Sequence, residues 1–350
     1  MLLESLANWG PFQIDALGLI TIFGAEAIRK SIGNFTQSRI CEYLPVLGSH
    51  VIASNQITDP VPGFVLYNIT DGIVATDIAP WFTYWLQSYP ITYTATTITL
   101  KADGRPMSTA RHSGSLALGV FCTAPLIILT ILMGDKWGIA NFASMIAMVI
   151  LRQLMLWELR LSIDKAVEKS IRDPGDDVKA LLTLPDGRAV TILGSRAMVV
   201  NCLLTDPRPL HPQLYKFFQF VAWIAFGAQA IALGMSTLFH QILCVVIMLS
   251  GTFLTAIHIG DLPSRIGTKL HLGVDLGNPD WFRSPAYARF DLTETEEETM
   301  VRWNLMPQRS NKFWWERFRT TYVPQRAPLY PHKCATRQQE TEKPMEDVER

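Results

Sequence analysis

The sequence contains little of what marks a secreted, zinc-binding or nucleic-acid-binding protein. Its five cysteines are scattered and none forms a CxxC pair, which argues against a disulfide framework and a zinc site. The 31 basic residues balance the 31 acidic ones without forming a basic stripe, so nucleic acid is not expected as a partner. The first basic residue is Arg29, so we expect no signal peptide, which would begin with a positively charged segment.

Motifs for common enzyme chemistry are missing as well. We find no Walker loop, no glycine-rich dinucleotide loop, no nucleophile elbow and no histidine-rich di-iron set. The sequence therefore predicts no cofactor and no metal. It leaves open whether the protein is an enzyme, because a cyclisation driven by the shape of a site needs no charged machinery.

What the chain has instead is long apolar runs. Residues 114–133 carry no charge, and about 20 helical residues at about 1.5 Å each cross a hydrocarbon core about 30 Å thick. Only three residues separate this run from a second one at residues 137–151, which is too few for anything but a tight reversal. We therefore expect the pair to form a transmembrane helical hairpin.

A second pair of apolar runs repeats this arrangement. Residues 217–236 and 238–257 lack Asp, Glu, Lys and Arg, and Thr237 alone separates them. The mean hydropathy of +0.17 is too polar for a chain made only of membrane helices, so sizeable water-facing parts are expected. The expected fold class is a mainly α membrane protein, with a four-helix transmembrane bundle of two tight hairpins and cytosolic α/β segments.

The water-facing parts include one expected β-hairpin. Residues 178–184 and 188–193 have strand character, and a Pro-Asp-Gly turn at residues 185–187 joins them. A short helix is expected directly afterwards, at residues 197–204. Alternating β-branched residues predict a further strand at residues 91–100.

These features divide the chain into six regions. We expect an N-terminal cytosolic or interfacial region, two transmembrane hairpins with a cytosolic insert between them, a cytosolic aromatic and charged tail, and a disordered C-terminus. The insert holds the β-hairpin and the short helix. In chain order, the expected N-terminal region, first hairpin, insert, second hairpin, tail and C-terminus are residues 1–112, 113–157, 158–216, 217–257, 258–337 and 338–350.

The distribution of positive charge predicts which side faces the cytosol. Lys136 is the only Lys or Arg expected at the hairpin tips. The opposite side carries many near the helix ends, namely Lys101, Arg105, Arg111, Arg152, Arg160, Lys165, Lys216, Arg265 and Lys269. By the positive-inside rule the bulky segments are cytosolic, and we expect a multi-pass protein of the endoplasmic reticulum or another endomembrane. The two glycosylation acceptors, Asn34 and Asn68, would then stay unmodified.

Polar residues inside the apolar runs are weak candidates for a catalytic site, because such residues are costly in lipid. They are Asn141, Arg152, Gln229 and His240. Structural roles are favoured for the last three. Arg152 would extend to the membrane surface, Gln229 would hydrogen-bond across the bundle, and His240 would lie at the wet boundary opposite the cytosol.

Two further patterns have structural interpretations. Small residues recur at helical spacing, at Ser115, Gly119 and Thr123 and again at Ala230 and Gly234, which predicts a seam between closely packed helices in preference to a ligand pocket. The residues from 312 to 319 mix basic and aromatic side chains. That segment would either lie on a membrane surface or pack against the middle of the chain.

Four segments resemble a family of uncharacterised multi-pass membrane proteins of filamentous fungi. They read ILMGDKWGIANFASM (131–145), VKALLTLPDGRAVTI (178–192), CLLTDPRP (202–209) and GAQAIALGMSTL (227–238). The resemblance covers residues 114–257, whereas residues 1–112 resemble no family that we recognise. Some fungal gene clusters for small molecules include such proteins, in pathways that fold a polyketide–peptide product into strained rings. The resemblance implies this association and no particular activity.

Three functions are compatible with these observations, and the lipid bilayer is a partner in each. The first is an auxiliary or tailoring protein that assists cyclisation of an apolar polyketide or polyketide–peptide intermediate beside partner enzymes. An apolar cavity lined by Trp and Phe would be its sign. The second is a non-catalytic scaffold for a cytosolic or cytochrome P450 partner, with a closed bundle and an exposed apolar patch. The third, an oligomeric channel or transporter, is the least expected because the spans hold few charges.

Overall fold

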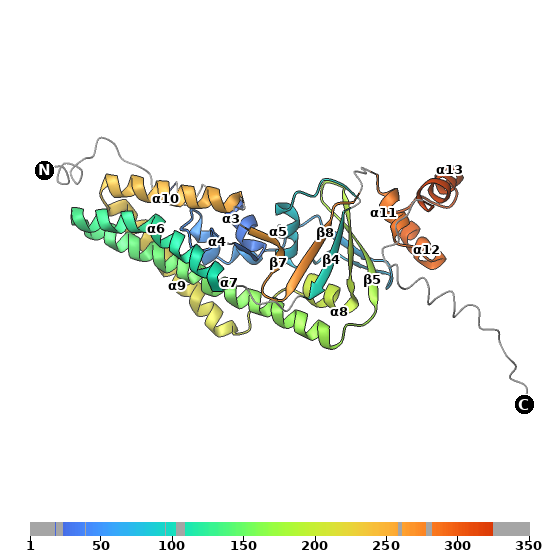
Figure 1. Ribbon diagram of the computed structural model, residues 1–350, viewed down its shortest axis with the longest axis horizontal. Coiled ribbons are helices and arrows are strands. Elements are labelled where there is room, and N and C mark those ends of the chain that lie inside the picture. The colour runs from blue at the N-terminus through green and yellow to red at the C-terminus, as the bar shows by residue number, and fades with distance from the viewer. Residues whose placement is uncertain are drawn as a thin grey trace, which may run out of the picture.

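The computed structural model describes residues 18, 24–38, 40–94, 96–102, 109–257, 261–277 and 282–324. The described residues form an elongated molecule with two parts (Figure 1). Long helices occupy one end, which we call the helical half. A β-sheet with shorter helices occupies the other end, which we call the sheet domain.

Within the described residues, four helices are long and apolar enough to cross a membrane, as the sequence predicts. The two expected tight connections are confirmed, since two residues join the first helix to the second and two residues join the third to the fourth. Both turns lie at the end of the helical half that is far from the sheet (Figure 1). The four helices are α6 (Thr109–Met133), α7 (Lys136–Arg172), α9 (Pro212–Met235) and α10 (Leu238–Ala256).

The helical half is more than these four helices, because part of the N-terminal region packs among them. Helix α3 (Ala25–Gly33) contacts α10, and helix α4 (Ser49–Ala53) contacts α9. We call residues 40–53 the inserted segment. Its Leu47 belongs to one buried cluster with Met145 of α7 and with Met248, which lies near the middle of α10. The sequence predicts a cytosolic or interfacial region here, so the insertion of this stretch among the long helices differs from the expectation.

The described strands form one eight-stranded sheet in the order β1-β7-β8-β4-β6-β5-β2-β3. Neighbouring strands are antiparallel except for the parallel pair β4 and β6. The strands come from the N-terminal region, the insert and the tail, so these three regions fold together. The strands are β1 (Thr36–Ser38), β2 (Val65–Asn68), β3 (Ile73–Ala75), β4 (Thr97–Ala102), β5 (Asp177–Thr183), β6 (Ala189–Ser195), β7 (Asp261–Ile266) and β8 (Leu270–Asp275).

The predicted β-hairpin is confirmed as β5 and β6, with Gly187 in the turn at a φ of 85° that favours glycine. The predicted helix after it is present in two pieces, α8 (Arg196–Met198) and a π-helical turn, η2 (Val199–Leu203). The predicted strand at residues 91–100 is displaced. Its second half forms β4, whereas residues 91–94 belong to no strand.

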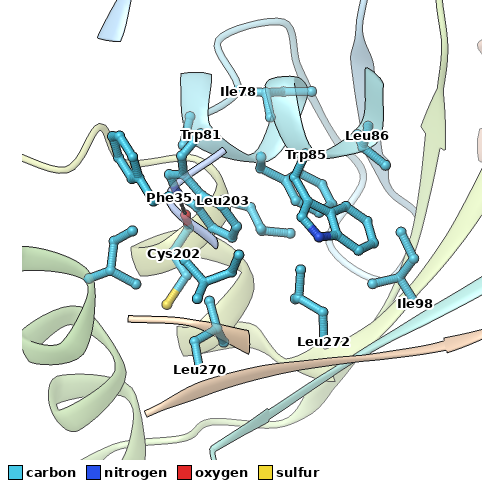
Figure 2. Packing of buried hydrophobic residues seen from close by; sticks show 14 of the residues in the cluster. Phe35, Ile78, Trp81, Trp85, Leu86, Ile98, Cys202, Leu203, Leu270 and Leu272 are labelled. Carbon is cyan, nitrogen blue, oxygen red and sulfur yellow. Dashed lines mark hydrogen bonds between the residues drawn. The ribbon is translucent and has the colours of Figure 1, made fainter. Parts of the chain in front are cut away.

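The main core lies between one face of the sheet and helix α5 (Pro80–Ser88), which begins with a proline at its first position. Figure 2 shows Trp81 and Trp85 of this helix above Leu270 and Leu272 of β8. The Trp81 indole donates to the Cys202 carbonyl at 3.1 Å, so this buried N–H is satisfied. The short turn η1 (Gln56–Thr58) and the second half of α7 complete this core.

Helices from the tail cover the other face of the sheet. They are α11 (Ser284–Arg289), α12 (Glu294–Arg302), α13 (Lys312–Arg317) and the π-helical turn η3 (Phe318–Tyr322), and we call them the C-terminal module. Trp315 and Phe318 are buried in one cluster with Leu181 and Ala189 of the β-hairpin. Of the two alternatives for this aromatic segment, the structure therefore shows packing against the middle of the chain.

Candidate functional site

The candidate residues Asn141 and His240 meet inside the helical half, near the hairpin turns. The Thr130 hydroxyl donates to the Leu126 carbonyl at 2.6 Å, so its oxygen is left to accept a proton from His240 Nδ1 at 2.8 Å. Asn141 Nδ2 donates to His240 Nε2 at 2.9 Å. This network assigns the neutral imidazole with its proton on Nδ1. Because His240 is only 2% exposed within the protein, the expectation of a wet interfacial histidine is wrong.

The third candidate, Gln229, lies in the same column of side chains. Asn141 Nδ2 approaches Cys244 Sγ at 3.3 Å, Cys244 Sγ approaches Met248 Sδ at 3.7 Å, and Gln229 Nε2 approaches Met248 Sδ at 3.6 Å. Gln229 does bond across helices, from α9 to α10. Each amide therefore directs an N–H group at sulfur, which is a weak acceptor, and Asn141 also donates to His240. Asn141 Oδ1 and Gln229 Oε1 are buried without a partner.

Asp135 ties the two hairpin turns to each other. Its carboxylate accepts from the Gly138 N–H at 2.9 Å, which caps α7, and from the Thr237 N–H at 2.8 Å. Thr237 in turn caps α10 by accepting from the His240 N–H. The anion therefore stabilises the start of one helix and the turn before the other.

Arg152 is separate from this column, and the inserted segment surrounds it. The expectation that it extends to the membrane surface is wrong, because it is 3% exposed. Its guanidinium donates to the carbonyls of Glu42 and, at 2.9 Å, of Leu44. Glu42 and Leu44 lie in the part of the inserted segment that is outside any helix or strand, so no regular structure pairs their carbonyls, and Arg152 donates to both.

Arg160 has a similar role about two turns further along α7. It donates to the Phe35 carbonyl at 3.1 Å and the Thr36 carbonyl at 2.6 Å, and it forms an ion pair with the Glu42 carboxylate. Gln153 adds a further donor to the Glu42 carbonyl. Arginine suits this position because its five N–H groups lie in one plane and reach several acceptors together.

Small residues let the inserted segment approach α6 and α10. A Cβ atom at Gly119 would lie 2.8 Å from the Tyr43 carbonyl oxygen, and one at Gly251 would overlap the Pro45 carbonyl. Ser115 donates to the Ile40 carbonyl at 3.1 Å. The predicted seam of small residues in α6 therefore exists, but its partner is the inserted segment. Gly234 has no atom within 4 Å of its ideal Cβ position and so forms no seam.

The cavities next to Arg152 are small. One, of about 30 Å³, lies among Ser31, Thr36, Glu42 and Arg160, and another, of about 10 Å³, lies beside Met148 and Gln229. A water molecule needs about 10–15 Å³ measured in this way, so these spaces hold one or two waters and no organic ligand.

The second half of α7 connects the helical half with the sheet domain. The Glu158 carboxylate is fully buried and accepts from the His211 backbone N–H at 3.2 Å and from its ring at 3.1 Å. Asp164 accepts from the N–H groups of Thr268 and Lys269 at 2.9 and 3.0 Å, which fixes the turn between β7 and β8. Both carboxylates have structural partners.

A wider groove lies on the C-terminal module, at the end of the molecule far from the helical half. Its volume is about 560 Å³, and its apolar floor includes Leu292, Phe318 and Val323. Glu294 is exposed at its edge, whereas Glu297 pairs with Arg309 at 2.8 Å. The buried Tyr287 also lines the groove, and burial raises the pKa of its hydroxyl.

Sequence reasoning missed several residues of these sites. Glu42 and Arg160 were not candidates because their partners lie far away in the sequence. Cys244 and Met248 could have been found, since His240, Cys244 and Met248 follow one another at intervals of four residues and share a helix face. Among the described residues, no group of three or more His, Cys, Asp and Glu side chains is arranged to hold a metal.

The fold buries the side chains of both glycosylation acceptors, Asn34 and Asn68. Asn34 is 2% exposed and accepts from the Thr36 N–H at 3.0 Å, whereas Asn68 is 3% exposed and donates to Asp71 at 2.7 Å.

Comparison with protein families, curated proteins and solved structures found no match to this chain. The resemblance to fungal membrane proteins therefore remains a prediction.

Proposed function

We propose that this chain is a multi-pass membrane protein whose sheet domain faces the cytosol and acts as a membrane-anchored, non-catalytic scaffold. The proposal begins with the surface of the four long helices. Large apolar side chains such as Phe121, Ile231 and Phe253 are between 63% and 76% exposed on them. Such large apolar side chains are unfavourable in water, and a lipid bilayer would provide the apolar surroundings that they need.

The proposed orientation follows from charge and from the position of the turns. Lys136 is at the turn between α6 and α7, whereas Lys165, Lys216 and Lys269 lie toward the sheet domain. The positive-inside rule then favours a cytosolic sheet domain. Protease treatment of sealed microsomes tests this topology. The sheet domain should be digested without detergent, and its protection would contradict the proposal.

The filled interior of the helical half supports a scaffold over the two alternatives. Residues 40–53 occupy the space among α7, α9 and α10, and Arg152 donates into them. A tailoring protein for an apolar intermediate would have an apolar cavity lined by Trp and Phe at this level. The cavities beside Arg152 are instead small and lined largely by Arg, Gln, Ser, Thr and Met. The inserted segment also leaves no pore between these helices for a channel.

The single observation that carries the scaffold function is the groove on the C-terminal module. It combines an apolar floor with the exposed Glu294 carboxylate at its edge, while Arg309 already neutralises Glu297. The occupant that fits is a peptide segment of a partner protein with one apolar side chain for the floor and one Lys or Arg for Glu294. The family resemblance suggests a biosynthetic enzyme at the same membrane as this partner.

A charge reversal at the edge of the groove tests this function. Glu294→Lys should abolish stoichiometric co-purification of the partner and its photo-crosslinking to a probe placed at the partly exposed Val323 in the groove. Glu298→Lys is the matched control, because Glu298 is exposed on the same helix and does not line the groove. Equal recovery of the partner with both variants would refute the docking role of the groove, as would partner capture that the probe does not detect.

A further inference from the structure

We propose that strand β3, at one edge of the eight-stranded sheet, binds an extended segment of a partner protein as an additional strand. β3 comes last in the order of the sheet, and among the described strands it pairs only with β2. No residue of β3 lines the groove on the C-terminal module. The inference therefore concerns a second surface and does not depend on the groove.

The hydrogen bonds of β2 show which backbone groups of β3 point outward. The Ile69 N–H, directly after β2, donates to the Lys179 carbonyl of β5 at 2.8 Å. Successive residues of a strand direct their backbone groups to opposite sides, so Asn68 directs its groups to β3, where it lies opposite Ile73. Val74 follows Ile73, and its N–H and carbonyl therefore point away from the sheet.

The edge formed by β3 lacks most of the features that prevent strands from pairing with other chains. Such features are a lysine, a proline, a bulge or a covering segment, besides short length. β3 consists of Ile73, Val74 and Ala75, and its register with β2 is regular. Ile73 and Val74 are 54% and 42% exposed, so the fold leaves two β-branched side chains in water at this edge.

The opposite edge of the sheet, β1, is closed by the protein itself. The Thr36 N–H donates to the Asn34 side chain at 3.0 Å, and the Thr36 carbonyl accepts from Arg160 at 2.6 Å. The register with β7 shifts between Thr36 and Gln37, and both residues are buried. Of the two edges, β3 is thus the one that can accept another strand.

An added strand would cover apolar side chains on both faces of the sheet. Val74 lies opposite Tyr67, whose ring contacts Trp303, directly after α12, with 5.4 Å between the ring centroids. Ile73 is on the opposite face, because side chains alternate along a strand. The segment that fits therefore has β-branched residues at successive positions, one for each face.

Charge at the ends of β3 favours a basic partner over a second copy of this chain. Asp77 is exposed and forms no ion pair with the described residues, whereas Asp71 pairs with Arg196. Antiparallel pairing of two copies centred on Val74 would place Asp71 of each copy opposite Asp77 of the other, and like charges in such pairs are destabilising. A Lys or Arg of the partner segment beside Asp77 would instead form an ion pair.

Binding of a synthetic peptide to the full-length protein, purified in detergent, tests this proposal. The probe is a short fluorescent peptide in which Val and Thr alternate between terminal lysines, and fluorescence anisotropy measures its affinity. Val74→Pro should weaken binding about tenfold, because proline removes the outward N–H. Val74→Thr is the matched control, since threonine keeps both the N–H and the β-branched shape, and it should bind as tightly as wild type.

Proline is compatible with the fold at this position, because the Val74 N–H forms no hydrogen bond within the sheet. Thermal unfolding checks that Val74→Pro remains folded. Asp77→Asn should weaken binding about threefold, which is the effect of losing one exposed ion pair. A peptide with glutamate in place of both lysines should bind less tightly to wild type than the original probe does.

Hydrogen–deuterium exchange locates the bound peptide without any variant and decides the matter if Val74→Pro does not fold. Residues 72–76 should exchange more slowly with the peptide present, whereas residues 36–38 of β1 and residues 292–297 beside the groove should not change. The proposal is overturned if the wild-type protein binds no peptide, if folded Val74→Pro binds it as tightly as wild type, or if residues 72–76 gain no protection.

Discussion

Arg152 and Leu44 are 108 positions apart in the chain, and the guanidinium of the first donates to the carbonyl of the second at 2.9 Å. This hydrogen bond joins a long apolar helix to a stretch without regular structure. Such a stretch is stable at membrane depth only when protein groups satisfy its backbone. Arg152 thus contributes to the architecture of the helical half, and its burial there is balanced by the carbonyls around it and by the nearby Glu42.

Replacing Arg152 tests this role. Arg152→Leu removes the donor to the Leu44 carbonyl and one of the two donors to the Glu42 carbonyl, and it leaves the Glu42 carboxylate with less positive charge nearby. We therefore expect a loss of about 3–5 kcal/mol in the free energy of unfolding. Thermal unfolding in detergent, followed by circular dichroism, measures the change. The exposed Arg302 is the control, and Arg302→Leu should change stability by no more than about 0.5 kcal/mol. Similar unfolding temperatures for both variants would show that Arg152 is dispensable.

The close approach of the inserted segment to α10 gives a second prediction. Gly251→Ala places a methyl group against the Pro45 carbonyl, so it should destabilise the protein by about 1–3 kcal/mol through overpacking. Gly234→Ala introduces the same methyl group on α9, where nothing lies within 4 Å. It should be neutral or stabilising by up to about 1 kcal/mol, because alanine favours helix. The two variants are compared by thermal unfolding, and an equal effect would contradict the packing described for Gly251.

Local signals predicted much of the fold. The absence of charge marked the four long helices, and the Pro-Asp-Gly turn marked the β5–β6 hairpin, because each depends on neighbouring residues alone. The insertion of residues 40–53 could not be predicted in this way. It depends on contacts such as Gly119 with Tyr43, in which one small residue matters only once its distant partner is known. The eight-stranded sheet was missed for the same reason, since β4 pairs with β6 and β8 across long stretches of sequence.

The candidate site was predicted in part. Asn141, Gln229 and His240 were chosen because polar groups are rare in apolar runs, and the structure brings all three into one column. The hydrophobic character of cysteine and methionine hid Cys244 and Met248, which resemble ordinary core residues in an apolar sequence. Arg152 was chosen for the same reason as the other candidates. Its partners could not be predicted, because they are backbone carbonyls, which every residue type has.

Asp135 gives a third prediction, on the link between the hairpin turns. Asp135→Ala removes the cap of α7 and the acceptor for the Thr237 N–H. We expect a loss of about 1–2 kcal/mol, the range of a strong helix cap, measured by thermal unfolding in detergent. Asp206→Ala is the control, since Asp206 is exposed in the loop before α9. A loss that Asp206→Ala shares would mean that the effect comes from charge in general and not from the link between turns.

The last prediction concerns alkaline pH and Cys202, which lies in the main core of the sheet domain. Burial raises the pKa of its thiol from 9.0 to about 12, so the folded state keeps the proton at a pH at which the unfolded chain loses it. Below pH 9.0 both states hold the proton, and Cys202 adds no pH dependence there. Between pH 9.0 and about 12 the unfolded state binds fewer protons, so stability falls as pH rises.

Cys202→Ala should therefore lose less of its free energy of unfolding over this range than wild type, by about 1.4 kcal/mol per pH unit at most. Chemical unfolding across the range measures both proteins, and tyrosine and lysine residues contribute equally to each. Parallel curves for the two would show that this thiol is not shielded from solvent in the folded protein.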